Sequence, residues 1–137
     1  MTLRSRPLSL VRKGKKITGG TVSFIKPYDS TAAIVNIPAT VKIAGVKFKV
    51  TEIAKNACKG NTAIKKVTIG KNVAKIGKNA FKNCKKLKTV TIKSKGLKGV
   101  GKNAFKGCPG KIVVKVPKTR LKNYKKLFPK KLNLKAV

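Results

Sequence analysis

Acidic residues are nearly absent from this 137-residue chain, which has only 2 Asp and Glu residues against 36 Lys and Arg, for a formal net charge of +34 at pH 7. Salt bridges within the chain can therefore neutralise almost none of the positive charge. A field of this size steers polyanions toward the surface but says little about the fold. The candidate partners are nucleic acid, anionic wall polymers, acidic glycans, anionic lipid surfaces and acidic proteins.

Histidine and tryptophan are missing altogether, and Asp29 and Glu52 are the two carboxylates. The usual proton shuttles and the bases that activate nucleophiles are therefore lacking. A zinc site needs about four closely spaced ligands, and the chain offers three scattered cysteines and no histidine. The full phosphate-binding pattern, Gly-x-x-x-x-Gly-Lys followed by Ser or Thr, does not occur either. The sequence predicts a protein that is not an enzyme and that uses no metal and no cofactor.

Long hydrophobic runs are also lacking, since none approaches the roughly 20 apolar residues of a membrane-spanning helix. Residues 1–16 are basic but hold too few apolar residues for the middle of a secretion signal. We expect residues 1–16 to be a basic flexible leader and residues 17–137 to form a single domain. If the protein is exported, we expect its signal to lie outside this chain.

What the chain does contain is a repeat. Three related segments begin at Ile53, Ile76 and Val100, spaced by 23 and then 24 residues, a period within the leucine-rich-repeat range. Three sets of apolar residues recur in register: Ile53, Ile76 and Val100; Ala57, Ala80 and Ala104; and Cys58, Phe81 and Phe105. We expect these side chains to point inward and to stack on one another.

Each segment continues into an alternating apolar pair, as in a half-buried strand. The pairs are Val67 and Ile69, Val90 and Ile92, and Val114 and Val116. Because one strand-plus-turn unit cannot bury its own apolar face, successive units must stack. The sequence therefore predicts a small parallel solenoid with three repeats over residues 53–117.

The segments on either side of the repeats are predicted to cover the ends of the stack. Residues 17–52 hold β-rich runs separated by turn residues, which indicates an N-terminal cap of antiparallel strands or a β-hairpin. The run IVNIPATV, from Ile34, is a candidate degenerate repeat. In residues 118–137, Leu121, Tyr124 and Phe128 lie at helical spacing, which predicts a C-terminal capping helix followed by a tail. The predicted fold class is an α/β, mainly β, repeat solenoid.

The second unit, IGKNAFKNCKKLKTVTI, resembles the BspA-type leucine-rich repeat, whose pattern is approximately I-G-x-x-A-F-x-x-C-x-x-L-x-x-V-x-I. The similarity extends over about residues 34–117. The first unit departs from the pattern at Cys58 and Asn61, and the third departs at Lys111. The resemblance implies a secreted or surface-attached bacterial protein used in adhesion or binding, and it implies no catalytic residue.

Three asparagines recur just before the small apolar positions of the units. They are Asn56, Asn79 and Asn103. An asparagine oxygen can accept hydrogen bonds from the free N–H groups at the start of a helix. We therefore predict that these asparagines cap short helical turns and have a structural role.

Cys84 and Cys108 occupy the same position in successive units and are predicted to be free, buried thiols. A disulfide requires Cα atoms within roughly 7 Å, whereas stacked turns on the helical side of a solenoid usually lie farther apart. Glu52 aligns with Lys75 of the next unit. For Glu52, a surface ion pair between stacked turns is the expected role.

Lysines follow the repeat in two columns: Lys55, Lys78 and Lys102, and then Lys59, Lys82 and Lys106. Stacking would align them into rows, on which a polyanion can displace many counterions at once. We predict that these six lysines form a polyanion-binding site. The alternative, that they are only a solvated face that keeps the protein soluble, stays open.

The resemblance, together with the lysine columns, implies a non-enzymatic binding or adhesion module of a bacterial surface or secreted protein, which binds wall polymers or host matrix glycans. The alternative is a cytoplasmic basic protein that binds nucleic acid or inhibits an enzyme acting on it. Such binding should be indifferent to base sequence, because arginine and aromatic residues, which read and stack bases, are few. A passive spacer within a larger surface protein, an acidic protein partner and any oligomeric state also remain open.

Overall fold

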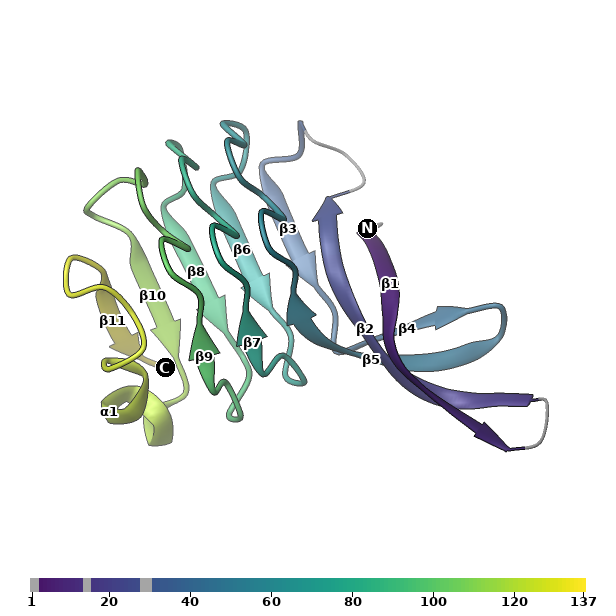
Figure 1. The fold of residues 1–137 in the computed structure, drawn as a ribbon. Helices are drawn as coiled ribbons and strands as arrows, with labels where there is room; N and C mark the ends of the chain where they lie inside the picture. The colour runs from purple at the N-terminus through teal and green to yellow at the C-terminus, as the bar shows by residue number, and fades with distance from the viewer. Residues whose placement is uncertain (1–2, 14–15, 28–30) are drawn as a thin grey trace.

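The chain forms a solenoid of stacked turns in the computed structural model, which describes residues 3–13, 16–27 and 31–137 (Figure 1). Two sheets run along its length. The first sheet contains, in spatial order, β11 (Asn133–Ala136), β10 (Val113–Val116), β8 (Thr89–Ile92), β6 (Lys66–Ile69) and β3 (Ile34–Ile37). The second contains β1 (Leu3–Lys13), β2 (Lys16–Pro27), β5 (Val46–Ile53), β7 (Lys75–Ile76) and β9 (Gly99–Val100), with β4 (Thr40–Ile43) also paired to β5.

The register of the first sheet confirms the predicted parallel stack. Val67 pairs with Val90, and Val90 pairs with Val114, so equivalent residues lie opposite one another in successive turns. All the apolar residues of these predicted strand pairs are buried. β3 pairs in parallel with β6, which confirms that the run from Ile34 is one more turn of the solenoid.

The core between the sheets is a column of inward side chains. The rings of Phe81 and Phe105 stack with centroids 5.4 Å apart, and Phe128 continues the column 5.7 Å from Phe105. Cys58 is buried at the opposite end, at the position that Phe81 and Phe105 occupy in the later turns. Of the residues predicted to point inward, only Val100 is half-buried rather than buried.

The three recurring asparagines do not cap helices, so that prediction is wrong. Asn56, Asn79 and Asn103 lie in turns with φ of 61°, 58° and 61°, in the left-handed region. Asparagine and glycine enter this region at lower cost than other residues. A second position follows the same rule, because Gly60, Asn83 and Gly107 occupy it with φ of 72°, 61° and 78°. The asparagines are therefore structural because of their backbone conformation.

A hairpin forms part of the N-terminal end, as predicted. β4 and β5 pair antiparallel through Ala44 and Gly45, whose φ values of 51° and 79° suit the tight turn that joins twisted strands. β2 lies on the other side of β5 and pairs with it in parallel.

Strand β1 covers most of the stretch for which the sequence predicts a flexible leader. It pairs antiparallel with β2 along its length, with register shifts between Arg4 and Ser5, Pro7 and Ser9, and Val11 and Arg12. Main-chain pairing of this kind does not require apolar side chains, and a flexible leader over residues 1–16 stays a prediction. The domain boundary at residue 16 stays a prediction.

The C-terminal segment contains less helix than the spacing of its apolar residues predicts. A 3-10 helix, η1 (Lys118–Arg120), leads into one turn of α-helix, α1 (Leu121–Tyr124). The hydroxyl of Tyr124 donates to the Ser94 carbonyl at 2.7 Å and accepts from the Leu97 N–H at 3.1 Å, which fixes this segment to the solenoid. The tail then forms β11 parallel to β10, a strand that the sequence analysis did not predict.

The cysteines of the described chain are free and buried, as predicted. The thiol of Cys84 donates to the Cys58 carbonyl at 3.0 Å, and the thiol of Cys108 donates to the Phe81 carbonyl at 2.9 Å. Each of these hydrogen bonds therefore links a thiol to the backbone of the preceding turn. The neighbouring thiol of Cys108, together with burial, raises the pKa of Cys84, and burial raises the pKa of Cys58 to about 12.

Replacing Asn79 tests the role of the left-handed turns. We expect Asn79→Ala to lower the free energy of unfolding by about 1 kcal/mol, because alanine resists positive φ, and Asn79→Gly to have a smaller effect. The Oδ1 atom of Asn79 has no hydrogen-bond partner within the described residues, so removing the side chain breaks no bond through that atom. Urea unfolding measures both values, and equal losses in the two variants would contradict this explanation.

Alkaline pH should destabilise the fold through the buried thiol of Cys58. Its pKa rises from an ordinary value of 9.0 to about 12 in the fold. Between these values the unfolded thiol ionises while the folded one stays protonated, so stability falls as pH rises, by up to about 1.4 kcal/mol per pH unit. Urea unfolding from pH 8 to 10 should show a steeper fall for the parent chain than for Cys58→Ala. Parallel curves would refute the prediction.

Candidate polyanion-binding site

The first predicted lysine column lies on the segments that follow β5, β7 and β9. The N–H of Asn56 donates to the carbonyl of Lys78 at 3.0 Å, and the N–H of Asn79 donates to the carbonyl of Lys102 at 3.1 Å. These bonds hold Lys55, Lys78 and Lys102 at the same level of three successive turns. All three lysines are exposed.

The second predicted column is held in the same way. Gly60 donates to the carbonyl of Lys82 at 2.7 Å, and Asn83 donates to that of Lys106 at 2.8 Å. Lys59 and Lys106 are exposed, and Lys82 is half-buried. We call the two columns together the lysine rows. The backbone aligns these six residues, and their role in binding stays a prediction.

Charge repulsion within a row is small enough for the fold to tolerate. Hydrogen-bonded neighbouring strands lie about 4.8 Å apart, and two unit charges at that distance in water repel by about 0.9 kcal/mol. Flexible lysine stems can separate the ammonium groups further, and salt screens what remains. The rows therefore concentrate positive charge at a regular spacing.

A further cluster of lysines, absent from the sequence prediction, surrounds a groove of about 630 Å³ at the starts of β6, β8 and β10. We call it the lysine groove. Its five lysines are all exposed: Lys65, Lys85, Lys86, Lys88 and Lys111. The remaining lining residues are Leu87, Thr89, Pro109 and Val113. The repeat pattern indicates only lysines that recur in all three units, and of the groove lysines only Lys65 and Lys88 share a repeat position.

The backbone around the groove is fixed by bonds between turns. The N–H groups of Lys88 and Thr89 donate to the Lys65 carbonyl at 2.9 and 3.2 Å. In the next turn, the N–H of Val113 donates to the Lys88 carbonyl at 3.0 Å. Three turns of the solenoid therefore contribute lysines to one concave surface.

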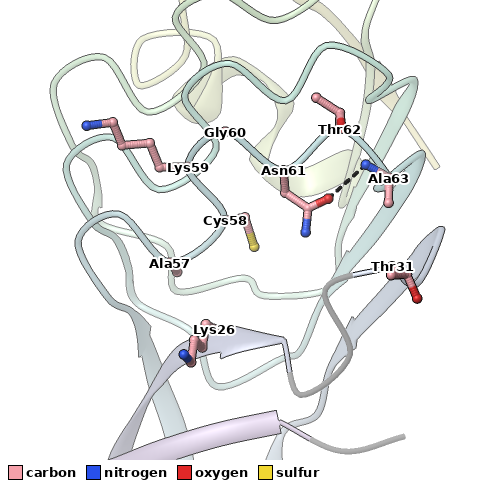
Figure 2. Close-up of a pocket in the computed structure, with 9 residues that line it drawn as sticks. All are labelled: Lys26, Thr31, Ala57, Cys58, Lys59, Gly60, Asn61, Thr62 and Ala63. Carbon is pink, nitrogen blue, oxygen red and sulfur yellow. Dashed lines mark hydrogen bonds between the residues drawn. The ribbon is translucent and has the colours of Figure 1, made fainter.

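A second pocket, of about 470 Å³, lies beside the first unit and is lined by Lys26, Thr31 and residues 57–63 (Figure 2). Asn61 takes the position that Cys84 and Cys108 hold in later turns. Its Oδ1 atom accepts from the N–H groups of Ala63 at 2.9 Å and Ile64 at 3.2 Å. The asparagine thus orders the turn. With only two lysines in its lining, this pocket is less basic than the lysine groove.

Of the two carboxylates in the sequence, Glu52 lies within the described residues. The register places Glu52 opposite Lys75, as expected from the repeat, and their ion pair stays a prediction. Asp29 lies outside the described residues. Within residues 3–13, 16–27 and 31–137, no group of three His, Cys, Asp or Glu side chains is placed to hold a metal ion. In the same part of the chain, the helices are too short and too polar to cross a bilayer.

Two solved structures share the fold. One is a leucine rich cell surface protein from Faecalibacterium prausnitzii, with a TM-score of 0.50 and 21% identity over 85% of this chain. The other is a leucine-rich repeat protein from Bacteroides ovatus, with a TM-score of 0.54 and 24% identity over 83% of this chain. The present chain spans only 26% and 37% of their lengths. No curated protein matches the chain.

The family assignment comes from the repeats themselves. The family model of the BspA type leucine rich repeat region matches residues 49–137 in six copies. The match begins within β5 and continues through β11, beyond the three repeats that the sequence analysis delimited. It covers more than half of the sequence and agrees with the stacked register of the turns. This chain belongs to the BspA-type leucine-rich-repeat family.

Proposed function

We propose that the chain is a non-enzymatic binding module of a bacterial surface or secreted protein, which holds anionic wall polymers or matrix glycans on its lysine rows. The observation that carries this proposal is the alignment of Lys55, Lys78 and Lys102 by backbone hydrogen bonds between turns. With 2 acidic residues in the whole chain, almost no internal partner competes for these ammonium groups.

The mode of binding follows from the chemistry of lysine. An ammonium group is a compact point charge and does not impose the planar, two-pronged geometry of arginine. A row of such groups binds a chain of anionic groups by releasing the counterions condensed on it, so affinity falls as salt rises. Binding of this kind selects for charge density and spacing rather than for the identity of each unit.

Cell-surface location is supported by the fold neighbours. One of them is described as a cell surface protein, and the present chain corresponds to about a quarter of its length. The chain would then act as one part of a longer surface protein, where its repeats face the wall or the surrounding matrix.

Salt elution from immobilised heparin tests the proposal. We expect the parent chain to be retained at about 0.15 M NaCl, and the triple variant Lys55→Gln, Lys78→Gln, Lys102→Gln to elute at lower salt because a row has lost its charge. A matched control removes three exposed lysines from the C-terminal segment, in the variant Lys118→Gln, Lys122→Gln, Lys125→Gln. The control should shift elution less than the row variant.

Three outcomes would count against this proposal. Elution of the parent chain from heparin below physiological salt would contradict polyanion binding. Equal shifts in the row variant and the control would mean that net charge alone determines retention. Tighter binding to duplex DNA than to purified Gram-positive wall polymer at the same salt would favour the nucleic-acid alternative.

A further inference from the structure

We propose that the lysine groove is a discrete site for a short acidic oligosaccharide, one whose sugar rings carry sulfate or carboxylate groups. This inference rests on the proposed function, because it locates where one segment of an anionic polymer is held. It assigns a ligand class to five lysines that do not belong to the lysine rows. The groove is concave, its backbone is fixed and its floor is partly apolar.

The groove combines a concave shape with five lysines, whereas the pocket beside the first unit has two. Lys65 comes from one turn, Lys88 from the next and Lys111 from the third, and all line a single cavity. A hollow lined by one sign of charge focuses the field and raises the local concentration of counter-ions above that over an open face. A ligand within it can contact several ammonium groups at once.

The lysines of the groove need little backbone ordering to bind. The carbonyl of Lys65 accepts from the N–H groups of Lys88 and Thr89, and the carbonyl of Lys88 accepts from that of Val113. The adjoining Leu87 and Ile112 side chains are buried in the core. Binding therefore orders only the lysine side chains, which lowers its entropic cost.

The floor of the groove favours a sugar over a nucleotide. Pro109 and Val113, which are half-buried, provide apolar contact surface beside the hydroxyl of Thr89, and the lining contains no aromatic side chain and no arginine. Bases in single strands are usually held by aromatic stacking, and guanine by arginine. The C–H face of a pyranose ring can instead pack on proline and valine while its acidic substituents reach the lysines.

The size and position of the groove also limit its occupant. Its volume of about 630 Å³ is within the range of small-ligand sites, roughly 300–1,000 Å³, and so suits a few sugar units rather than a globular partner. An added peptide strand would require a free sheet edge, and the edges of this sheet are β3 and β11. The groove instead lies at the starts of β6, β8 and β10, which are all inner strands of this sheet.

A heparin-derived tetrasaccharide tests the inference by calorimetry at about 0.15 M NaCl. We expect saturable one-to-one binding to the parent chain and no binding of an uncharged tetrasaccharide. The groove variant Lys65→Gln, Lys88→Gln, Lys111→Gln should weaken binding roughly tenfold, as expected for the loss of three exposed ion pairs. The row variant Lys55→Gln, Lys78→Gln, Lys102→Gln removes the same charge and should weaken binding less than about threefold.

An NMR titration of the parent chain gives a second readout that does not depend on how the variants fold. The amide signals of Lys88, Thr89 and Val113 should shift with saturation, while those of Lys55 and Lys102 should stay in place. The charge-preserving variant Lys65→Arg, Lys88→Arg, Lys111→Arg should retain binding. Shifts confined to the lysine rows would overturn the groove assignment.

The outcomes separate the groove from the proposed function. Retention of full-length heparin without tetrasaccharide binding would overturn the groove and leave the rows as the binding surface. Equal weakening in the groove and row variants would also overturn it, since total charge would then explain the affinity. A short single-stranded DNA that binds the groove more tightly than the tetrasaccharide would refute the ligand class. Failure of both heparin forms to bind would remove the proposed function as well.

Discussion

Hydrogen bonding between the backbones of successive turns is the constraint on which the structure depends. It pairs the strands of the first sheet in register, and it continues beyond β7 and β9 through the irregular segments that carry the lysine rows. A parallel ladder of this kind places equivalent residues directly over one another. The stacked rings of Phe81 and Phe105 inside, and the columns of lysine outside, follow from the same register. Core and charged surface are therefore two results of one backbone arrangement.

The parts of the fold that could be predicted from sequence are those that recur. Apolar positions such as Ile76, Phe81 and Val90 repeat with a fixed period, and their burial confirms the stacking predicted from it. Local backbone conformation was harder to predict, because Asn79 could equally signal a helix cap or a left-handed turn. β11 was missed because an alternation over only four residues is a weak signal, and its place depends on pairing with β10, a contact distant in sequence.

The candidate site, too, could be predicted from the sequence only where it follows the repeat. The lysine rows follow the repeat, so their alignment could be read from residue spacing. The lysine groove combines Lys65 and Lys88, which share a repeat position, with Lys85, Lys86 and Lys111, which do not. Its hollow shape depends on how the loops before β8 and β10 pack, and no periodic pattern encodes that packing. A search for runs of adjacent lysines near predicted strand starts would have found part of the cluster.

The alternation of glycine and asparagine at the second left-handed position also limits which substitutions the chain can accept there. A methyl group added at Gly107 would approach the side-chain oxygen of Asn83 closely, in addition to meeting an unfavourable φ of 78°. The outer lysines face no such restriction, because their side chains extend into solvent. Substitution is thus restricted at the bends and permitted on the outer face, so the surface charge can change while the path of the backbone is kept.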